Sequence, residues 1–235
     1  MMTAWALFIL ELVVLFFSSK YIFQALFTLS YRIFRKESSA SIPVFIIFLP
    51  GVIIHELAHY LTAEILLVKV HNLELSPKII DGRLKMASVE MRQSDIVRQM
   101  LIGVAPIIAG LGILTASVYG IIHFFNVRDL LSTPNGFGII ALLIYLTFVI
   151  SNTMFSSKKD VEGAFKFLLI LFFLVSLVTL TAFLLKVDVV AIFSNIILSK
   201  TVIDFLNLVD FLLFPAVVID VVFIFLANLL FKRHL

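Results

Sequence analysis

Long apolar stretches separated by short polar segments form the main pattern along the 235 residues of this chain. A helix needs about 20 predominantly apolar residues to cross the hydrocarbon core of a bilayer. Stretches of about that length lie at 4–29, 41–67, 99–124, 137–155 and 163–186. With a further span near the C-terminus, the pattern predicts an all-α polytopic membrane protein with about six transmembrane helices.

The last apolar region, 188–231, is too long for a single crossing of the bilayer. Three polar residues interrupt its first half, namely Asp204, Asn207 and Asp210. We therefore expect an interfacial helix in the first part of this region, followed by one span that ends at Phe231.

The longest polar interval, 69–98, contains two short segments in which polar and apolar residues alternate, 68–71 and 83–86. Alternation with a period of two is typical of β-strands. An Asp-Gly pair at 81–82 lies between these segments and suits a hairpin turn, although Pro77 should make the hairpin irregular. We expect a small membrane-associated β-hairpin here, with a plain charged loop as the alternative.

Composition agrees with a membrane protein, because 62% of the residues are hydrophobic and the mean hydropathy is +1.15. Soluble domains average about 45–50% apolar residues. The net charge of +3 is too small and too scattered to indicate a nucleic-acid partner. The chain contains no cysteine, so disulfides and thiolate ligands are excluded, and a metal would be held by His and carboxylate groups.

The segment His55-Glu56-Leu57-Ala58-His59 lies within the second apolar stretch. On a helix His55 and His59 are one turn apart, so that both imidazoles can bind one metal ion. Glu56 is then placed to take a proton from a metal-activated water rather than to bind the metal. Pro50 should kink the helix and let water approach. Ionisable residues inside a membrane segment usually have a function.

A catalytic zinc needs a third protein ligand, and the residues alone leave several candidates for it. Glu64 should lie on the opposite face of the same helix from His55. His71 lies on the polar interval, where we expect it to be solvated. The carboxylates in or beside apolar segments stay open at this point: Glu11, Asp160, Asp204, Asp210 and Asp220.

The order of these parts resembles the site-2 protease family of intramembrane zinc metalloproteases. Members have a His-Glu-x-x-His helix, a membrane-associated hairpin, a helix with a Gly-Pro-x-x-Asn motif and an Asn-x-x-Pro-x-x-x-Leu-Asp-Gly motif. The resemblance covers about residues 41–175, with 101–109 and 152–163 in the places of the last two motifs. In the first of these two motifs, the chain has Ala105 in the place of Gly and Ala109 in the place of Asn. In the second it has Phe155 in the place of Pro, Lys159 in the place of Leu and Val161 in the place of Gly.

The resemblance implies that Asp160 is the third zinc ligand, because Asn152 and Asp160 keep the family's separation. The alternative is that Asp160 caps the helix that follows it. The resemblance also implies that the hairpin adds a strand to an unwound substrate, with Val70, Leu84 and Met86 as substrate-binding residues. Asn152 would then orient the substrate, or simply cap a helix end.

The expected function is zinc-dependent cleavage of transmembrane segments, with zinc on His55, His59 and Asp160 and Glu56 as the general base. The substrate would be a single-pass membrane protein or a remnant signal peptide. The protein would be embedded in a lipid bilayer. In a prenyl-protein type of membrane metalloprotease, Glu162 would instead compete with Asp160.

Two alternatives from other functional classes stay open. One is a transporter whose polar pathway contains carboxylates of the apolar segments together with His55 and His59. The other is a non-catalytic membrane scaffold, which would tolerate loss of Glu56.

We expect three parts: a retained first transmembrane segment with a basic loop at 1–40, the metalloprotease core at 41–175 and C-terminal helices at 176–235. The expected location is the cell membrane of a prokaryote. The positive-inside rule assigns the cytoplasmic side both to the basic residues at 32–36 and to those at 69–98. A single span between them cannot satisfy both, so the orientation stays open.

Overall fold

The computed structural model describes residues 2–80, 83–124, 132–155, 158–185, 197 and 199–232. Within these ranges, six helices are long and apolar enough to cross a membrane, which confirms the predicted fold class. They are α1 (Met2–Phe34), α2 (Glu37–Ile65), α3 (Ile96–Phe124), α5 (Pro134–Thr153), α6 (Lys158–Leu184) and α8 (Lys200–Lys232).

The C-terminal region differs from the expectation of two helical parts, because residues 200–232 form one continuous helix. The three polar residues in its first half do not break it. Asp204 and Asn207 are exposed, whereas Asp210 is buried against neighbouring helices. Polar side chains interrupt an apolar pattern without interrupting backbone hydrogen bonds, so the helix continues through them.

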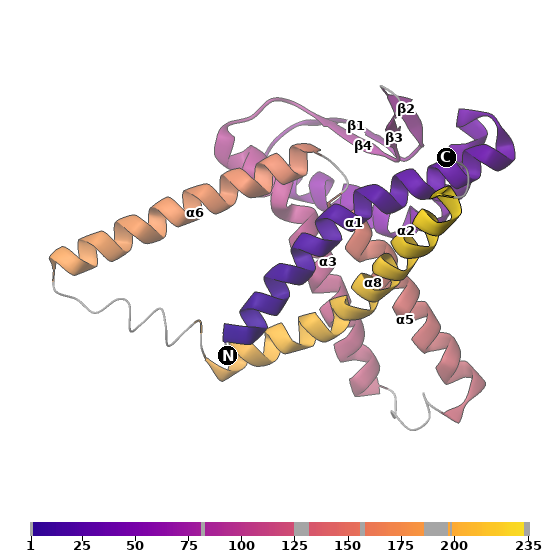
Figure 1. Cartoon of the computed structure of the whole chain (residues 1–235). Coiled ribbons are helices and arrows are strands. Elements are labelled where there is room, and N and C mark those ends of the chain that lie inside the picture. Colours follow the sequence, from indigo (N-terminus) through magenta and orange to yellow (C-terminus); the bar gives the residue numbers. More distant parts are fainter. Residues whose placement is uncertain are drawn as a thin grey trace.

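The main core lies where α1, α2, α3, α5 and α8 meet (Figure 1). Leu15, Phe48, Leu114, Val149 and Leu213, one from each of these helices, are all at most 1% exposed. Helix α1 also lies alongside α8, and Trp5 near its start donates a hydrogen bond to the Ile197 carbonyl. This bundle surrounds the middle of α2, which carries the histidines.

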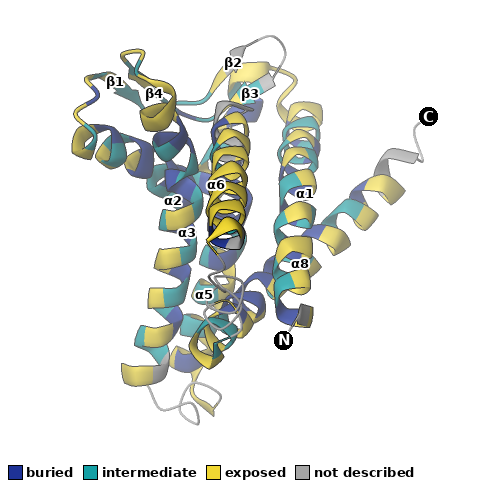
Figure 2. Ribbon diagram, turned by 90° about the vertical axis from the view of Figure 1, so that its left-hand side faces the viewer, coloured by how far each residue is buried: buried dark blue, intermediate teal, exposed yellow. Residues whose placement is uncertain are grey.

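Helix α6 packs on α3 but buries few of its own apolar side chains, as the exposed colour along it in Figure 2 shows. Near the start of α6 the contact brings one glycine of each helix together. A Cβ on Gly163 would lie 3.1 Å from the Cα of Gly103, so the two backbones touch. An apolar helix exposed on most sides is typical of a span that faces lipid.

The polar interval folds into two small antiparallel sheets, which confirms the predicted hairpin. Strand β1 (Val70–Glu74) pairs with β4 (Ser88–Met91), and β2 (Lys78–Ile80) pairs with β3 (Arg83–Lys85). The first expected strand therefore pairs with residues 88–91 rather than with 83–86. The predicted turn at 81–82 lies outside the described residues.

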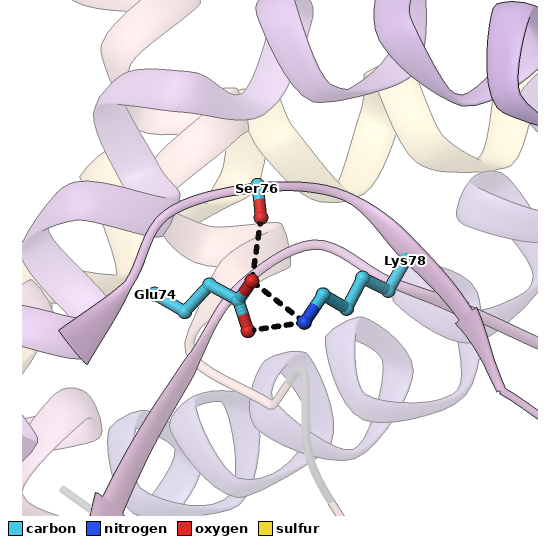
Figure 3. Close-up of polar contacts among 3 residues, drawn as sticks. All are labelled: Glu74, Ser76 and Lys78. Atoms are coloured by element: carbon cyan, nitrogen blue, oxygen red, sulfur yellow. Dashed lines mark hydrogen bonds and ion pairs between the residues drawn. The ribbon is translucent and has the colours of Figure 1, made fainter. Parts of the chain in front are cut away.

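A salt bridge spans the break between the two sheets. The Lys78 ammonium lies 2.6 Å from the Glu74 carboxylate, and the Ser76 hydroxyl donates to the same group at 3.1 Å (Figure 3). The hydrogen bond from Lys78 lowers the pKa of Glu74. Pro77 lies within this break, and since it lacks an N–H it cannot continue a ladder there.

The sheets and the connection between α1 and α2 lie at the same end of the bundle (Figures 1 and 2). Strand β3 contacts α1, and β2 contacts α2. The basic residues at 32–36 and those of the sheet region therefore lie at the same end of the bundle, as the positive-inside rule favours for both. In the described part of the structure, the expected separation of the two groups by one full crossing between them is not found.

Candidate metal centre

Helix α2 carries the candidate metal-binding residues on a buried face. His55 and His59 are 3% and 7% exposed, and Glu56 is 6% exposed. Glu64, expected on the opposite face, is exposed. The helix continues through Pro50, and the Tyr145 hydroxyl of α5 donates to the Ile47 carbonyl in the preceding turn at 2.7 Å. A neighbouring helix thus supports the turn that the proline loosens.

The two imidazoles meet through their Nε2 atoms, which lie 3.1 Å apart. Their ring planes are nearly perpendicular, at 87°, with centroids separated by 4.7 Å. Two nitrogen ligands on a tetrahedral zinc, each at about 2.0–2.1 Å, would be separated by about 3.3 Å. The observed separation therefore fits two ligands of one ion after a shift of a few tenths of an ångström.

The ring of His59 is oriented by helix α3. Its Nδ1 lies 2.9 Å from the Ile102 carbonyl, and because a carbonyl only accepts, Nδ1 must carry the proton. The Nε2 of a neutral His59 then presents its lone pair to the site. Metal-binding histidines commonly donate their second ring N–H to a carbonyl or carboxylate in this way, which fixes both tautomer and orientation.

A close helix contact sets the position of the histidine face. A Cβ on Gly51, one turn before His55, would lie 2.6 Å from the Val149 carbonyl oxygen and 2.5 Å from the Thr153 hydroxyl. Only glycine permits this approach of α2 to the carboxyl end of α5. Small residues allow such close packing between membrane helices.

The predicted third ligand, Asp160, belongs to the first turn of α6, but its side chain lies outside the described part of the structure. Gly163, one turn further on, contacts Gly103, the neighbour of Ile102. Among the described residues, no three His, Cys, Asp or Glu side chains form a group that could hold a metal. The role of Asp160 stays a prediction. The competing Glu162 is exposed.

The other candidate ligands lie elsewhere in the fold. His71 is exposed in β1, and Asp204 is exposed in α8. Glu11 of α1 and Asp210 of α8 are buried and close enough to interact electrostatically. Asp220 is fully buried and accepts hydrogen bonds from Ser18 and Asn152.

The predicted substrate-binding residues have packing partners in the described structure. Val70 packs against Ala63, Val68 and Ile102, and so lies beside the residue that orients His59. Leu84 and Met86 are partly buried against the main core. Asn152 is 0% exposed and donates to Asp220 at 2.9 Å. These contacts leave the predicted substrate roles untested.

The sequence pointed to Asp220 as a possible metal ligand and to Asn152 as a possible substrate contact or helix cap, and it did not reveal their pairing. The two residues are 68 positions apart, and no periodicity links them. The cap of α3 was also missed: the Arg98 amide donates to Asp95 at 3.0 Å, which lowers the pKa of Asp95. An Asp shortly before an apolar helix is a recognisable signal for such a cap.

A scan against protein-family models, a search of curated proteins and a search of solved structures each found no match for this chain.

Proposed function

We propose that this protein is an intramembrane zinc-dependent endopeptidase, similar to site-2 proteases, that cleaves transmembrane segments of membrane proteins. The observation that carries the proposal is the facing pair of His55 and His59 Nε2 atoms, 3.1 Å apart within an apolar helix. Burying two histidines and a glutamate in such a helix is costly unless they have a function.

The donor set suits zinc, because two neutral imidazoles and one carboxylate are ordinary ligands of catalytic zinc sites. His55 and His59 would be two of the ligands and Asp160 the third. The contact of Gly163 with Gly103 supports this choice, because Asp160 precedes Gly163 by one helical turn, about 5 Å. Ile102, next to Gly103, already holds His59.

Bound zinc would supply a water of lowered pKa and would polarise the scissile carbonyl. Glu56, buried beside His55, would take the proton from the attacking water and pass it to the leaving amine as the C–N bond breaks. Ile102 would keep the lone pair of His59 Nε2 directed at the site throughout. The buried surroundings would keep other water away from these groups.

The substrate would be a single-pass membrane protein or a remnant signal peptide, unwound locally so that its backbone groups are free. Strand β1 begins beside Ile102 and is hydrogen-bonded to β4. The outer edge of a two-stranded sheet can accept a further strand by main-chain hydrogen bonds. Val70 lies on β1 itself, whereas Leu84 of β3 and Met86 just after β3 would contact the substrate from the second sheet. By the same resemblance, we infer that the protein is located in the cell membrane of a prokaryote.

The test uses purified full-length protein in lipid nanodiscs, with its zinc content measured beside cleavage of a model transmembrane substrate. We expect one zinc per chain in the wild type. Glu56→Gln should keep the zinc and abolish cleavage, whereas Glu64→Gln, on the exposed face of the same helix, should change neither. Normal turnover by Glu56→Gln would exclude this mechanism, whereas a wild type that shows no turnover would favour the scaffold alternative.

A second candidate function, a transporter, is favoured by a different observation. Three carboxyl groups, Glu11, Asp210 and Asp220, are buried between α1 and α8, and such groups often mark ion or proton pathways. Proteoliposomes would then show proton or cation flux that Asp210→Asn abolishes. Flux with no bound zinc would replace the protease proposal.

A further inference from the structure

The carboxyl end of α5 is held on three sides, in contrast to its exposed amino end. Val149 and Thr153 contact Gly51 of α2. On a second side, Met154 and Ile150 pack where a Cβ on Gly110 of α3 would lie 2.4 and 3.2 Å from them. The third side carries Asn152, and residues 149–155 are all buried.

The third contact is a polar network that joins three helices. One Asp220 carboxylate oxygen accepts from the Asn152 amide at 2.9 Å, and the other accepts from the Ser18 hydroxyl. The Asn152 amide also donates to the Phe148 carbonyl, one turn back in α5, at 3.0 Å. Ser18 and Asp220 are 4% and 0% exposed, so the network is shielded from water.

A buried polar network is costly to break, because each group left without its partner keeps the desolvation penalty of burial. The apolar contacts along α5 are close but have no required direction. The hydrogen bonds to Asp220 add a direction, because they require donor and acceptor to be aligned. The network therefore fixes the rotation and height of the last turn of α5.

The proposed zinc ligand follows this turn closely in the sequence, with residues 156–157 between the two helices outside the described part of the structure. Phe155 is buried, and α6 begins at Lys158, two positions before Asp160. We propose that Asp220 and Ser18 are positioning residues that act through Asn152 on the end of α5 and thereby set the approach of Asp160 to His55 and His59. This inference rests on the proposed function, and it assigns Asp220 a role outside the ligand set.

The test measures Co²⁺ binding to the metal-free full-length protein in nanodiscs, by affinity and by the visible absorption spectrum, which reports ligand geometry. Asp220→Leu removes both hydrogen bonds and puts a larger, apolar side chain in the place of the carboxylate. We expect it to weaken Co²⁺ binding by about 10- to 100-fold, the usual effect of losing a group that supports a ligand, and to alter the spectrum. Asp220→Asn, which keeps an acceptor for Asn152, should restore most of the affinity.

Neighbouring serines of α1 supply a matched control. Ser18 and Ser19 are both buried, and each hydroxyl lies 3.3 Å from the carbonyl oxygen three residues before it, but only the Ser18 hydroxyl donates to Asp220. Ser18→Ala should weaken Co²⁺ binding and Ser19→Ala should leave it unchanged, even if both lower the thermal unfolding midpoint equally. This pair decides the question if Asp220→Leu does not fold.

The outcomes separate this inference from the proposed function. A wild-type protein that binds no Co²⁺ overturns both. Tight binding by the wild type with unchanged affinity and spectrum in folded Asp220→Leu and Ser18→Ala overturns the positioning role alone. In a double-mutant cycle with Asn152→Ala, the combined loss of affinity should be no greater than the larger single loss. Additive losses would show that Asp220 does not act through Asn152.

Discussion

Gly163 of α6 lies directly against Gly103 of α3, so closely that a Cβ on Gly163 would be 3.1 Å from the Gly103 Cα. The preceding residue of α3, Ile102, accepts the hydrogen bond from His59. The start of α6 and the second histidine are therefore both held by the same turn of α3. This turn connects two parts of the candidate site that are far apart in the sequence.

The histidine pair leads to a direct prediction on metal content. His59→Ala should lose both zinc and cleavage, because the remaining imidazole supplies one zinc ligand in place of the two Nε2 atoms that lie 3.1 Å apart. His71→Ala, which removes an exposed histidine of β1, should change neither. Zinc measured after dialysis at a buffered free-metal concentration checks both variants, and full zinc retention by His59→Ala would contradict the assignment.

The close packing at Gly51 predicts that a larger residue at this position destabilises the protein. Gly51→Ala should lower the free energy of unfolding by about 1–3 kcal/mol, because the new methyl group must push α2 away from the backbone of Val149. Gly112→Ala is the control, since a Cβ there meets nothing within 4 Å. It should be neutral or stabilise by up to about 1 kcal/mol. Equal unfolding midpoints for the two variants in detergent would refute the close contact.

The hydrophobic pattern of the sequence predicted the helices well, but it did not predict which helices contact each other. The expected span at 41–67 became α2, Glu37–Ile65, because length and hydrophobicity determine a membrane helix. The same uniform hydrophobicity hides which face of each helix packs on which neighbour. Neither the Gly51 contact with α5 nor the bond from Asn152 to Asp220 follows from a periodic pattern, since both join segments distant in the chain.

The hairpin shows the same limit on a smaller scale. Alternating residues marked strands correctly near 70 and 84, but pairing was assigned by order alone. Pro77 and the salt bridge between Glu74 and Lys78 divide the interval, so that two short ladders form in place of one. A pairing register depends on such breaks, which local alternation does not reveal.

The sheet edge predicts a position-dependent effect of proline. If β1 or β4 adds a strand to the substrate, proline at a residue whose N–H points outward should block cleavage and leave zinc in place. Proline at the paired position Leu73, opposite Val89, should instead disturb the sheet itself. Cleavage and zinc content measured for each variant distinguish the cases. A scan with no zinc-retaining, inactive variant would remove the edge from the mechanism.

The basic residues at 32–36 and those of the sheet region lie at the same end of the bundle, which predicts the orientation of the protein in the membrane. The positive-inside rule puts the sheet and the α1–α2 connection in the cytoplasm. The chain has no cysteine, so single cysteines can be introduced without background labelling. An impermeant thiol reagent added to intact cells should label Ser132→Cys, before α5 at the opposite end, and spare Asn72→Cys, at an exposed position of β1. The reverse pattern would invert the orientation.

The third zinc ligand predicts a contrast between neighbouring carboxylates. Asp160→Ala should lose bound zinc at a buffered concentration that saturates the wild type, because two imidazoles alone hold zinc much more weakly than three ligands. Glu162→Ala, two residues further along α6 and exposed, should retain it. Asp210→Ala should retain it as well, since Asp210 is buried in α8 beside Glu11 of α1. Circular dichroism confirms the helical fold of each variant before the metal is measured. Zinc loss confined to Glu162→Ala would favour the prenyl-protease arrangement, and loss confined to Asp210→Ala would move the ligand to α8.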